Sequence, residues 1–109
     1  MILKLSAATK IALDGFTAYL YNSKKDSPNL SAVYVDCHSH HARVAVKSSI
    51  RAYFVIDGTG EFDLGPDTYR VGPSDLVIIP PRTPYAYRGR MKLFEVNTPA
   101  TDASDETAA

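Results

Sequence analysis

The chain has 109 residues, of which 45% are hydrophobic, and twelve basic residues balance twelve acidic ones. This length supplies one modest hydrophobic core and is too short for two. The balanced charge gives no general electrostatic attraction to nucleic acid or to an anionic membrane, so neither is expected as a partner and a small molecule is.

The first ten residues, MILKLSAATK, place two lysines around a very short apolar run. They lack the apolar core of a secretory signal, and no stretch of the chain reaches the length of a membrane span. A cytoplasmic location is therefore expected. Cys37 is the only cysteine, so it cannot form an internal disulfide and should be a reduced thiol.

Short runs rich in Val, Ile, Tyr and Phe follow, separated by Gly, Pro, Asp and Asn, which is typical of an all-β domain with many turns. Tight turns at DGTG (57–60) and LGPD (64–67) predict hairpins, and the prolines of PPRTP (80–84) predict a stiff loop. A small barrel or sandwich fits this number of strands. The predicted strands cover residues 16–22, 30–36, 43–47, 51–57, 60–64, 67–71, 75–80, 85–88 and 91–96.

The last stretch, ATDASDETAA after Pro99, has no large apolar side chain and three acidic ones. Such a segment buries too little apolar surface to offset the entropy lost on ordering. The sequence therefore predicts one domain over residues 1–98 and a flexible C-terminal tail over 99–109.

The block GTGEFDLGPDTYRVGPSDLVIIPPRTPYAYRG, residues 58–89, resembles the cupin superfamily. It contains, in order, a glycine-rich turn, an apolar strand that ends in Ile-Pro, and a proline-containing loop before the next strand. The resemblance covers about residues 30–97. It implies an all-β cupin double-stranded β-helix, a jelly-roll-like barrel, in a small protein that pairs as a homodimer.

Cupins commonly hold a metal ion with two histidines, a glutamate and a third histidine at fixed spacings. Counted back from Gly58, the first motif of the family puts Ala45 and Lys47 at the histidine positions and Arg51 at the glutamate position, and the second motif puts Tyr85 at the last position. Ala45 has no donor atom, and cationic Lys47 and Arg51 repel a metal ion. No metal is therefore expected at the usual positions, and no cofactor is predicted.

Alternate residues of a strand share a face, so an inward Arg51 predicts an inward Tyr53, and Tyr85 and Tyr87 point inward together. With Lys47, these side chains predict a basic, tyrosine-lined pocket. It suits a carbohydrate, a sugar phosphate or a small organic acid, because a guanidinium holds anions and phenols form hydrogen bonds.

Each of these residues also has a structural interpretation. Arg51 could pair with Glu61, Asp63 or Glu95, and Lys47 could extend to the rim. The three tyrosines could be ordinary core aromatics.

Three functions remain open from the sequence. The first is a metal-independent small-molecule-binding cupin; whether it is an enzyme stays open, with Tyr85 or a deprotonated Lys47 as its acid-base group. The second is a metal-dependent dioxygenase or isomerase, with iron, manganese, nickel or zinc held by His38 and His40, and by His41 as a third ligand. A solvated polar turn is the favoured interpretation of these histidines, since no carboxylate lies at motif spacing. One of them could instead line the pocket mouth as an acid-base group, because the ordinary pKa of histidine lies near neutrality. The third is a non-catalytic sensor or structural dimer module.

Overall fold

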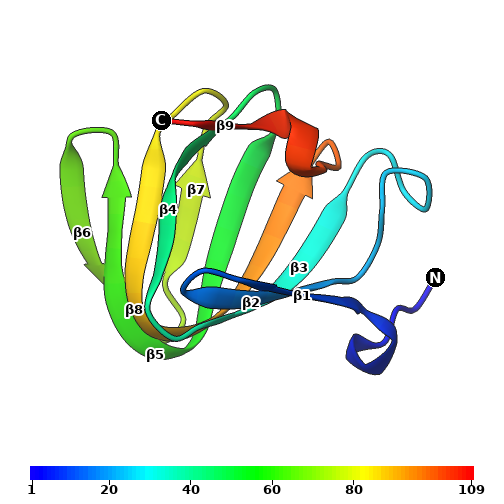
Figure 1. The fold of residues 1–109 in the computed structure, drawn as a ribbon, viewed down its shortest axis with the longest axis horizontal. Coiled ribbons are helices and arrows are strands. Elements are labelled where there is room, and N and C mark those ends of the chain that lie inside the picture. The colour runs from blue at the N-terminus through cyan, green and yellow to red at the C-terminus, as the bar shows by residue number, and fades with distance from the viewer.

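Nine strands form one curled sheet in the computed structural model, which describes residues 1–109. The sheet rolls into a barrel, so the predicted all-β barrel is confirmed (Figure 1). Two short 3-10 helices, η1 (Leu5–Ala7) and η2 (Ala103–Asp105), lie near the two ends of the chain. The strands are β1 (Thr9–Leu13), β2 (Phe16–Leu20), β3 (Ser31–Cys37), β4 (His40–Val46), β5 (Ile50–Leu64), β6 (Asp67–Val71), β7 (Leu76–Ile79), β8 (Tyr85–Thr98) and β9 (Glu106–Ala108).

The two longest strands, β5 and β8, organise the barrel because they pair with each other along almost their whole length. The other edge of β8 carries β4 at its start and β3 at its end, and the other edge of β5 carries β7 at its start and β6 at its end. Figure 1 shows β5 curving through the bottom of the barrel. Each long strand therefore runs through both sides of the barrel, pairing with one short strand on each side.

Glycines permit the bend of these two strands. Gly58 and Gly89 have φ angles of +84° and +128°, which side chains rarely adopt. A Cβ atom at Gly58 would lie 2.0 Å from the carbonyl oxygen of Arg90, and one at Gly89 would lie 2.6 Å from that of Thr59. Only glycine fits where the two backbones approach this closely.

The same glycines explain a wrong prediction, the hairpin at residues 57–60. Residues 51–57 and 60–64 belong to the single strand β5, and residues 85–88 and 91–96 belong to β8. A bulge between Val55 and Asp57 and the glycine bend turn the strand without reversing it. The hairpin between β5 and β6 is confirmed, whereas β1 and β9 were not predicted.

The core fills the inside of the barrel with the alternate side chains of its strands. Its largest members are Tyr53, Phe62, Tyr85 and Tyr87, which are at most 1% exposed. Aliphatic side chains and the buried Cys37 complete this cluster. No helix of the structure has the length and apolar character needed to span a membrane.

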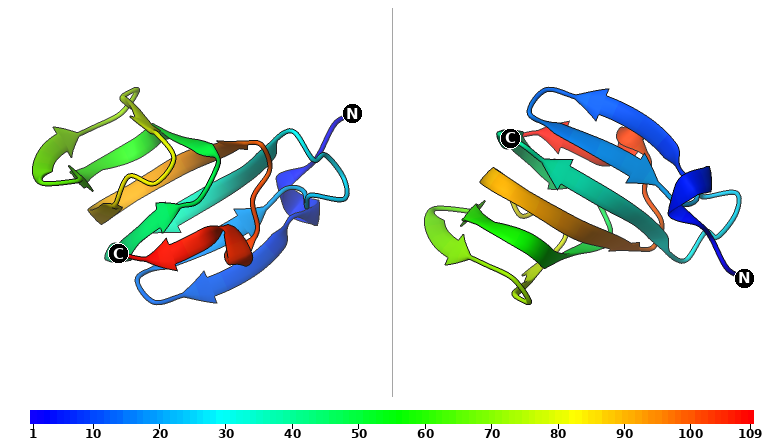
Figure 2. Two further views of the ribbon diagram at one scale, coloured as in Figure 1. Left: turned by 90° about the horizontal axis from the view of Figure 1, so that it is seen from above. Right: turned by 90° about the horizontal axis from the view of Figure 1, so that it is seen from below.

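The segment predicted as a flexible tail has a defined place in the structure. Asp102 caps η2 through a capping box, and β9 pairs with β4 at Val44, Ala45 and Val46. Backbone pairing and polar contacts hold this segment, which explains why its lack of apolar residues was misleading. In Figure 2, seen from above and below, the segment runs along β4 toward the C-terminus.

Candidate functional site

A cavity of about 170 Å³ opens at one mouth of the barrel, between the β1–β2 hairpin and the C-terminal segment. One wall is apolar and comes from β1, β2 and β3: Ile11, Leu13, Phe16, Ala18, Leu20 and Val33. The other wall is polar except for Ala103 and comes from β4, β5, β8 and the C-terminal segment: His41, Arg51, Glu95, Thr101, Asp102, Ala103 and Glu106. The cavity therefore suits a ligand with one apolar face and several polar groups.

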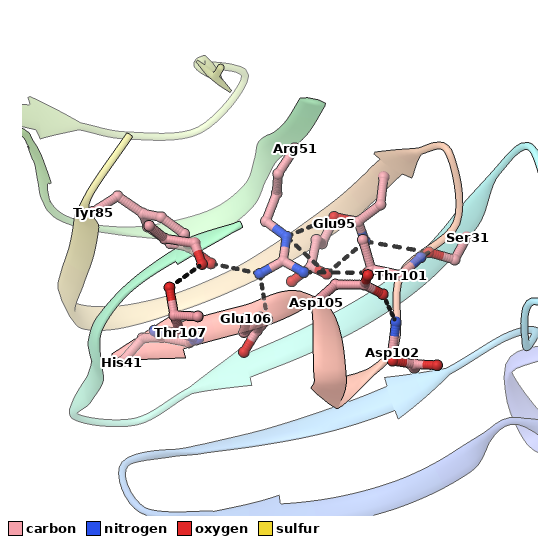
Figure 3. Close-up of polar contacts among 12 residues, drawn as sticks. Ser31, His41, Arg51, Tyr85, Glu95, Thr101, Asp102, Asp105, Glu106 and Thr107 are labelled. Atoms are coloured by element: carbon pink, nitrogen blue, oxygen red, sulfur yellow. Dashed lines mark hydrogen bonds and ion pairs between the residues drawn. The ribbon is translucent and has the colours of Figure 1, made fainter. Parts of the chain in front are cut away.

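Arg51 lies buried at the centre of the polar wall, and each of its three guanidinium nitrogens donates at least one hydrogen bond (Figure 3). Its Nε atom donates to Asn97 Oδ1 at 2.6 Å and lies 3.5 Å from Glu95 Oε2. Its Nη1 atom donates to the Tyr85 hydroxyl at 2.8 Å and to Glu106 Oε1. Burial alone would lower the pKa of Arg51, but Glu95 and the other nearby groups outweigh it and raise this pKa, so the guanidinium stays charged.

The predicted basic pocket is wrong in one respect, because Lys47 lies exposed outside the barrel. Val46 points inward instead, and alternation then turns Lys47 outward. Of the proposed partners of Arg51, Glu95 is confirmed, whereas Glu61 and Asp63 pair with Arg88. The mouth therefore has one cation against several carboxylates and carries no excess of positive charge.

The three predicted tyrosines are brought together beneath the cavity and are not part of its lining. The hydroxyl groups of Tyr53 and Tyr85 share a hydrogen bond of 2.7 Å, and the rings of Tyr53 and Tyr87 meet edge to face at 5.3 Å. Burial raises the pKa of all three phenols, so they stay protonated and cannot serve as bases. The Tyr87 hydroxyl is the one side-chain polar atom that is inaccessible to solvent and has no hydrogen-bond partner.

His41 reaches the barrel interior, where the family motif had predicted Ala45 and Lys47. It lies opposite Tyr87 near the start of the pairing of β4 with β8, and a bulge between His41 and Val44 shifts the register of the strand. The imidazole stacks on Phe16 at 4.8 Å and on Tyr85 at 5.5 Å between ring centroids. These rings hold it in one orientation at the cavity wall.

The protonation of His41 follows from its hydrogen bond. Its Nδ1 atom lies 2.6 Å from the carbonyl oxygen of Ala42, which only accepts, so Nδ1 carries the proton. Burial, opposed by that hydrogen bond and by nearby carboxylates, lowers the pKa of His41. The ring is therefore neutral at pH 7 with its lone pair on Nε2, which has no protein partner and is not sealed from solvent. This atom can act as a base.

The other two histidines lie elsewhere. His38 is exposed, and His40 contacts Ser39 and lies 3.6 Å from the Asp14 carboxylate. The proposed metal site of His38, His40 and His41 is therefore not assembled, and no group of three or more His, Cys, Asp or Glu side chains is placed to hold a metal ion.

Sequence reasoning did not identify which of the three histidines lines the pocket, and it missed Asn97 and Glu106 as partners of Arg51. His41 stands in the stretch DCHSHH, which the sequence pattern assigns to the turn before a strand beginning at residue 43, whereas β4 begins at His40. Asn97 has the same parity on β8 as Glu95, a signal that could have found it. Glu106 lies in a segment without apolar periodicity.

The comparisons establish the fold. No family model and no curated protein sequence matches the chain. The Streptomyces protein Pac13, described as a nucleoside dehydratase, superposes with a TM-score of 0.92 at 24% identity over 100% of this chain and 90% of that chain. Two Tyr-to-Phe variants and a His-to-Gln variant of Pac13, each with uridine, superpose equally well.

Two further solved structures extend the comparison. KdgF from Halomonas sp. has a TM-score of 0.82 at 15% identity over 95% of this chain and 97% of that chain. Oxalate decarboxylase OxdC from Bacillus subtilis has a TM-score of 0.83 at 15% identity over 95% of this chain and 31% of that chain. The chain has the cupin fold. At these identities the likeness concerns the fold, and activity must be argued from the site.

Proposed function

We propose that the protein is an acid-base enzyme that binds a neutral nucleoside or sugar at the barrel mouth and removes water from it. The observation that carries this proposal is the neutral His41, whose Nδ1 proton is bound by Ala42 and whose Nε2 is free at the cavity wall. A buried imidazole that stays neutral at pH 7 is suited to take a proton from a substrate.

The charge of the mouth favours a neutral ligand over the sugar phosphate or organic acid first considered. Glu95 and Glu106 both lie against Arg51, and Asp102 adds a third carboxylate to the lining. An incoming phosphate or carboxylate would be repelled by this arrangement. Hydroxyl groups of a sugar can hydrogen-bond to the same atoms, and an apolar or planar part of the ligand can pack on Phe16 and its neighbours.

The proposed reaction needs a base and an acid. His41 Nε2 takes a proton from a carbon atom of the substrate, the released electron pair forms a carbon–carbon double bond, and the neighbouring hydroxyl leaves. The His41 imidazolium donates this proton to the leaving hydroxyl, which departs as water, so His41 ends neutral. Tyr53, Tyr85 and Tyr87 remain protonated, and Tyr85 supports the imidazole by stacking.

The description of Pac13 as a nucleoside dehydratase, and its structures with uridine, support the choice of a nucleoside as the first ligand to test. Uridine binding should be measured by calorimetry for the wild-type protein and for His41→Gln. The wild-type protein should bind, and mass spectrometry of candidate substrates should show loss of one water that His41→Gln abolishes. Absence of stabilisation by any nucleoside or sugar in a thermal-shift panel would contradict the proposal and favour the sensor or structural module.

A metal-dependent reaction is the weaker alternative, because the histidine donors are dispersed. Elemental analysis of untagged protein tests it: stoichiometric iron, manganese, nickel or zinc that is lost in a His38→Ala, His40→Ala variant would overturn metal independence. The cytoplasmic location stays a prediction.

We also propose that the protein works as a homodimer, through the outer face of the sheet. Cross-strand pairs form a continuous apolar row from Tyr34 through Phe94 and Phe54 to Leu76. Five apolar side chains on or beside this row are 41–60% exposed: Ile50, Phe54, Ile56, Leu76 and Ile78. Together they expose roughly 500 Å², about the apolar share of one side of a standard homodimer interface.

Light scattering on a size-exclusion column tests this face. The wild-type protein should have the mass of two chains, and a Phe54→Lys, Leu76→Lys variant should have the mass of one. Asp67→Lys makes the same change of charge at the exposed turn between β5 and β6 and should remain a dimer. A monomeric wild-type protein would contradict the proposal, and a stable complex with a different protein would assign the face to that partner.

A further inference from the structure

Glu106 reaches the mouth from the last strand of the chain. Its pairing with Val46 places β9 along β4, so that the Glu106 carboxylate meets Arg51 across the top of the cavity (Figure 3). The side chain of Glu106 is 31% exposed, whereas that of Arg51 is 3% exposed. Glu106 is therefore the partner of Arg51 on the side that faces solvent.

The contacts of Arg51 divide into two groups. Asn97, Glu95 and Tyr85 all belong to β8 and hold the guanidinium from inside the barrel. Glu106 and Thr101 belong to the C-terminal segment and hold it from outside, with Thr101 Oγ1 at 3.3 Å from Nη2. Even without the outer group, the inner group includes a carboxylate, Glu95, that balances the charge of Arg51.

Glu106 is thus a second carboxylate on a cation that is already balanced. Its position at Nη1 is the position that a ligand carboxylate or phosphate would take on this guanidinium. Neutralising Glu106 would leave the pair of Arg51 and Glu95 in place and free one outward donor atom of the guanidinium for an anion.

We infer that Glu106 is the specificity-determining residue of the mouth, because it occupies Arg51 and so selects neutral ligands against their phosphorylated or carboxylated counterparts. The choice of nucleosides as probes rests on the proposed function, but the charge selection does not. A cupin barrel with Arg51 in this place would otherwise present a site for anions, and the last strand of the chain converts it into a site for neutral molecules.

The experiment compares three probes, uridine, uridine 5′-monophosphate and inorganic phosphate, by calorimetry on the wild-type protein and on Glu106→Gln. We expect the affinity ratio of the monophosphate to uridine to rise at least about tenfold in Glu106→Gln. We also expect phosphate binding that the wild-type protein lacks. Glu61→Gln neutralises an exposed carboxylate paired with Arg88 and should leave the ratio unchanged.

Glu106→Asp separates the effect of the lost charge from the effect of a loosened C-terminal segment. It shortens the side chain and keeps the charge, so it should weaken the contact with Arg51 without gaining phosphate binding. An unchanged ratio and no phosphate binding in folded Glu106→Gln would overturn the inference, and so would equal gains in Glu106→Gln and Glu106→Asp. If neither the wild-type protein nor any variant bound uridine, but Glu106→Gln alone gained phosphate binding, the proposed substrate would be contradicted. The proposed selection against anions by Glu106 would then be supported.

Discussion

The floor and the cover of the barrel mouth are held by different forces. The floor consists of His41, Arg51, Tyr53, Tyr85 and Glu95, which are at most 9% exposed and come from strands β4, β5 and β8. The cover is the segment 100–108, which contains a 3-10 helix without buried residues and a three-residue strand. Packing and long strand pairing fix the floor, whereas exposed polar contacts hold the cover, and local opening is easiest in segments of this second kind. The proposed base thus lies in the stable part and the proposed selectivity in the adjustable part.

Substitution of Arg51 should have the largest effect on the floor. Arg51→Met leaves the buried carboxylate of Glu95 without its cation, which should lower the free energy of unfolding by about 3–5 kcal/mol in urea denaturation. Arg88→Met is the matched control, because Arg88 is exposed and its loss should change stability little. Equal effects of the two substitutions would show that the buried network does not stabilise the floor.

The bend of β5 should be the next most sensitive point. Gly58→Ala adds a Cβ atom 2.0 Å from the Arg90 carbonyl oxygen at a positive φ, which should destabilise the protein by about 3 kcal/mol or more. At Gly65 φ is also positive, but no atom lies within 4 Å, so Gly65→Ala should cost only about 1–2 kcal/mol. If Gly58→Ala proved as mild as Gly65→Ala, the close approach of β5 and β8 would be wrong.

The pH dependence of stability should report on His41. Its pKa is lower in the folded protein than the unfolded value of 6.5, so the unfolded chain binds the proton more readily. The contribution of His41 to the free energy of unfolding is therefore at its full value above pH 6.5 and declines as the pH falls below that value. Denaturation of the wild-type protein and of His41→Gln between pH 7.5 and 5 should show this decline only in the wild type. A decline of the same size in both would assign the effect to other groups.

The cover should respond to a change that leaves the floor untouched. Lys24 holds it from outside, with Nζ 2.7 Å from Asp105 Oδ2 and 3.5 Å from Asp102 Oδ2. Lys24→Ala should leave global stability nearly unchanged and speed amide hydrogen exchange in residues 101–108, measured by mass spectrometry. Lys25→Ala next to it is the control. Faster exchange in β5 and β8 as well would mean that cover and floor open as one unit.

The sequence predicted the floor better than the cover. The inward positions of Arg51, Tyr53, Tyr85 and Tyr87 followed from two-residue alternation and are confirmed, while their role in binding stays a prediction. Alternation failed in β4, since the bulge between His41 and Val44 gives no signal in the pattern; His41 and Val46 both point inward, and Lys47 turns out.

Two other features could not be predicted because their sequence signals are ambiguous or absent. Glycines mark both hairpins and bends, so the long strands β5 and β8 were each divided in two. The cover is built from Ala, Thr, Ser and acidic residues, whose backbone pairing with β4 depends on the finished barrel. Tertiary structure, and not local preference, makes that segment a strand.

The central claim is that His41 is a neutral base at the mouth of a barrel that binds a neutral ligand. Nitrogen-15 NMR of the imidazole tests it directly, because both ring nitrogens report the tautomer and the pKa. We predict a pKa below 6.5, a proton on Nδ1 at pH 7, and a shift of the Nε2 resonance on addition of uridine. A pKa at or above 6.5, a proton on Nε2, or an Nε2 resonance that does not respond to uridine would contradict the account.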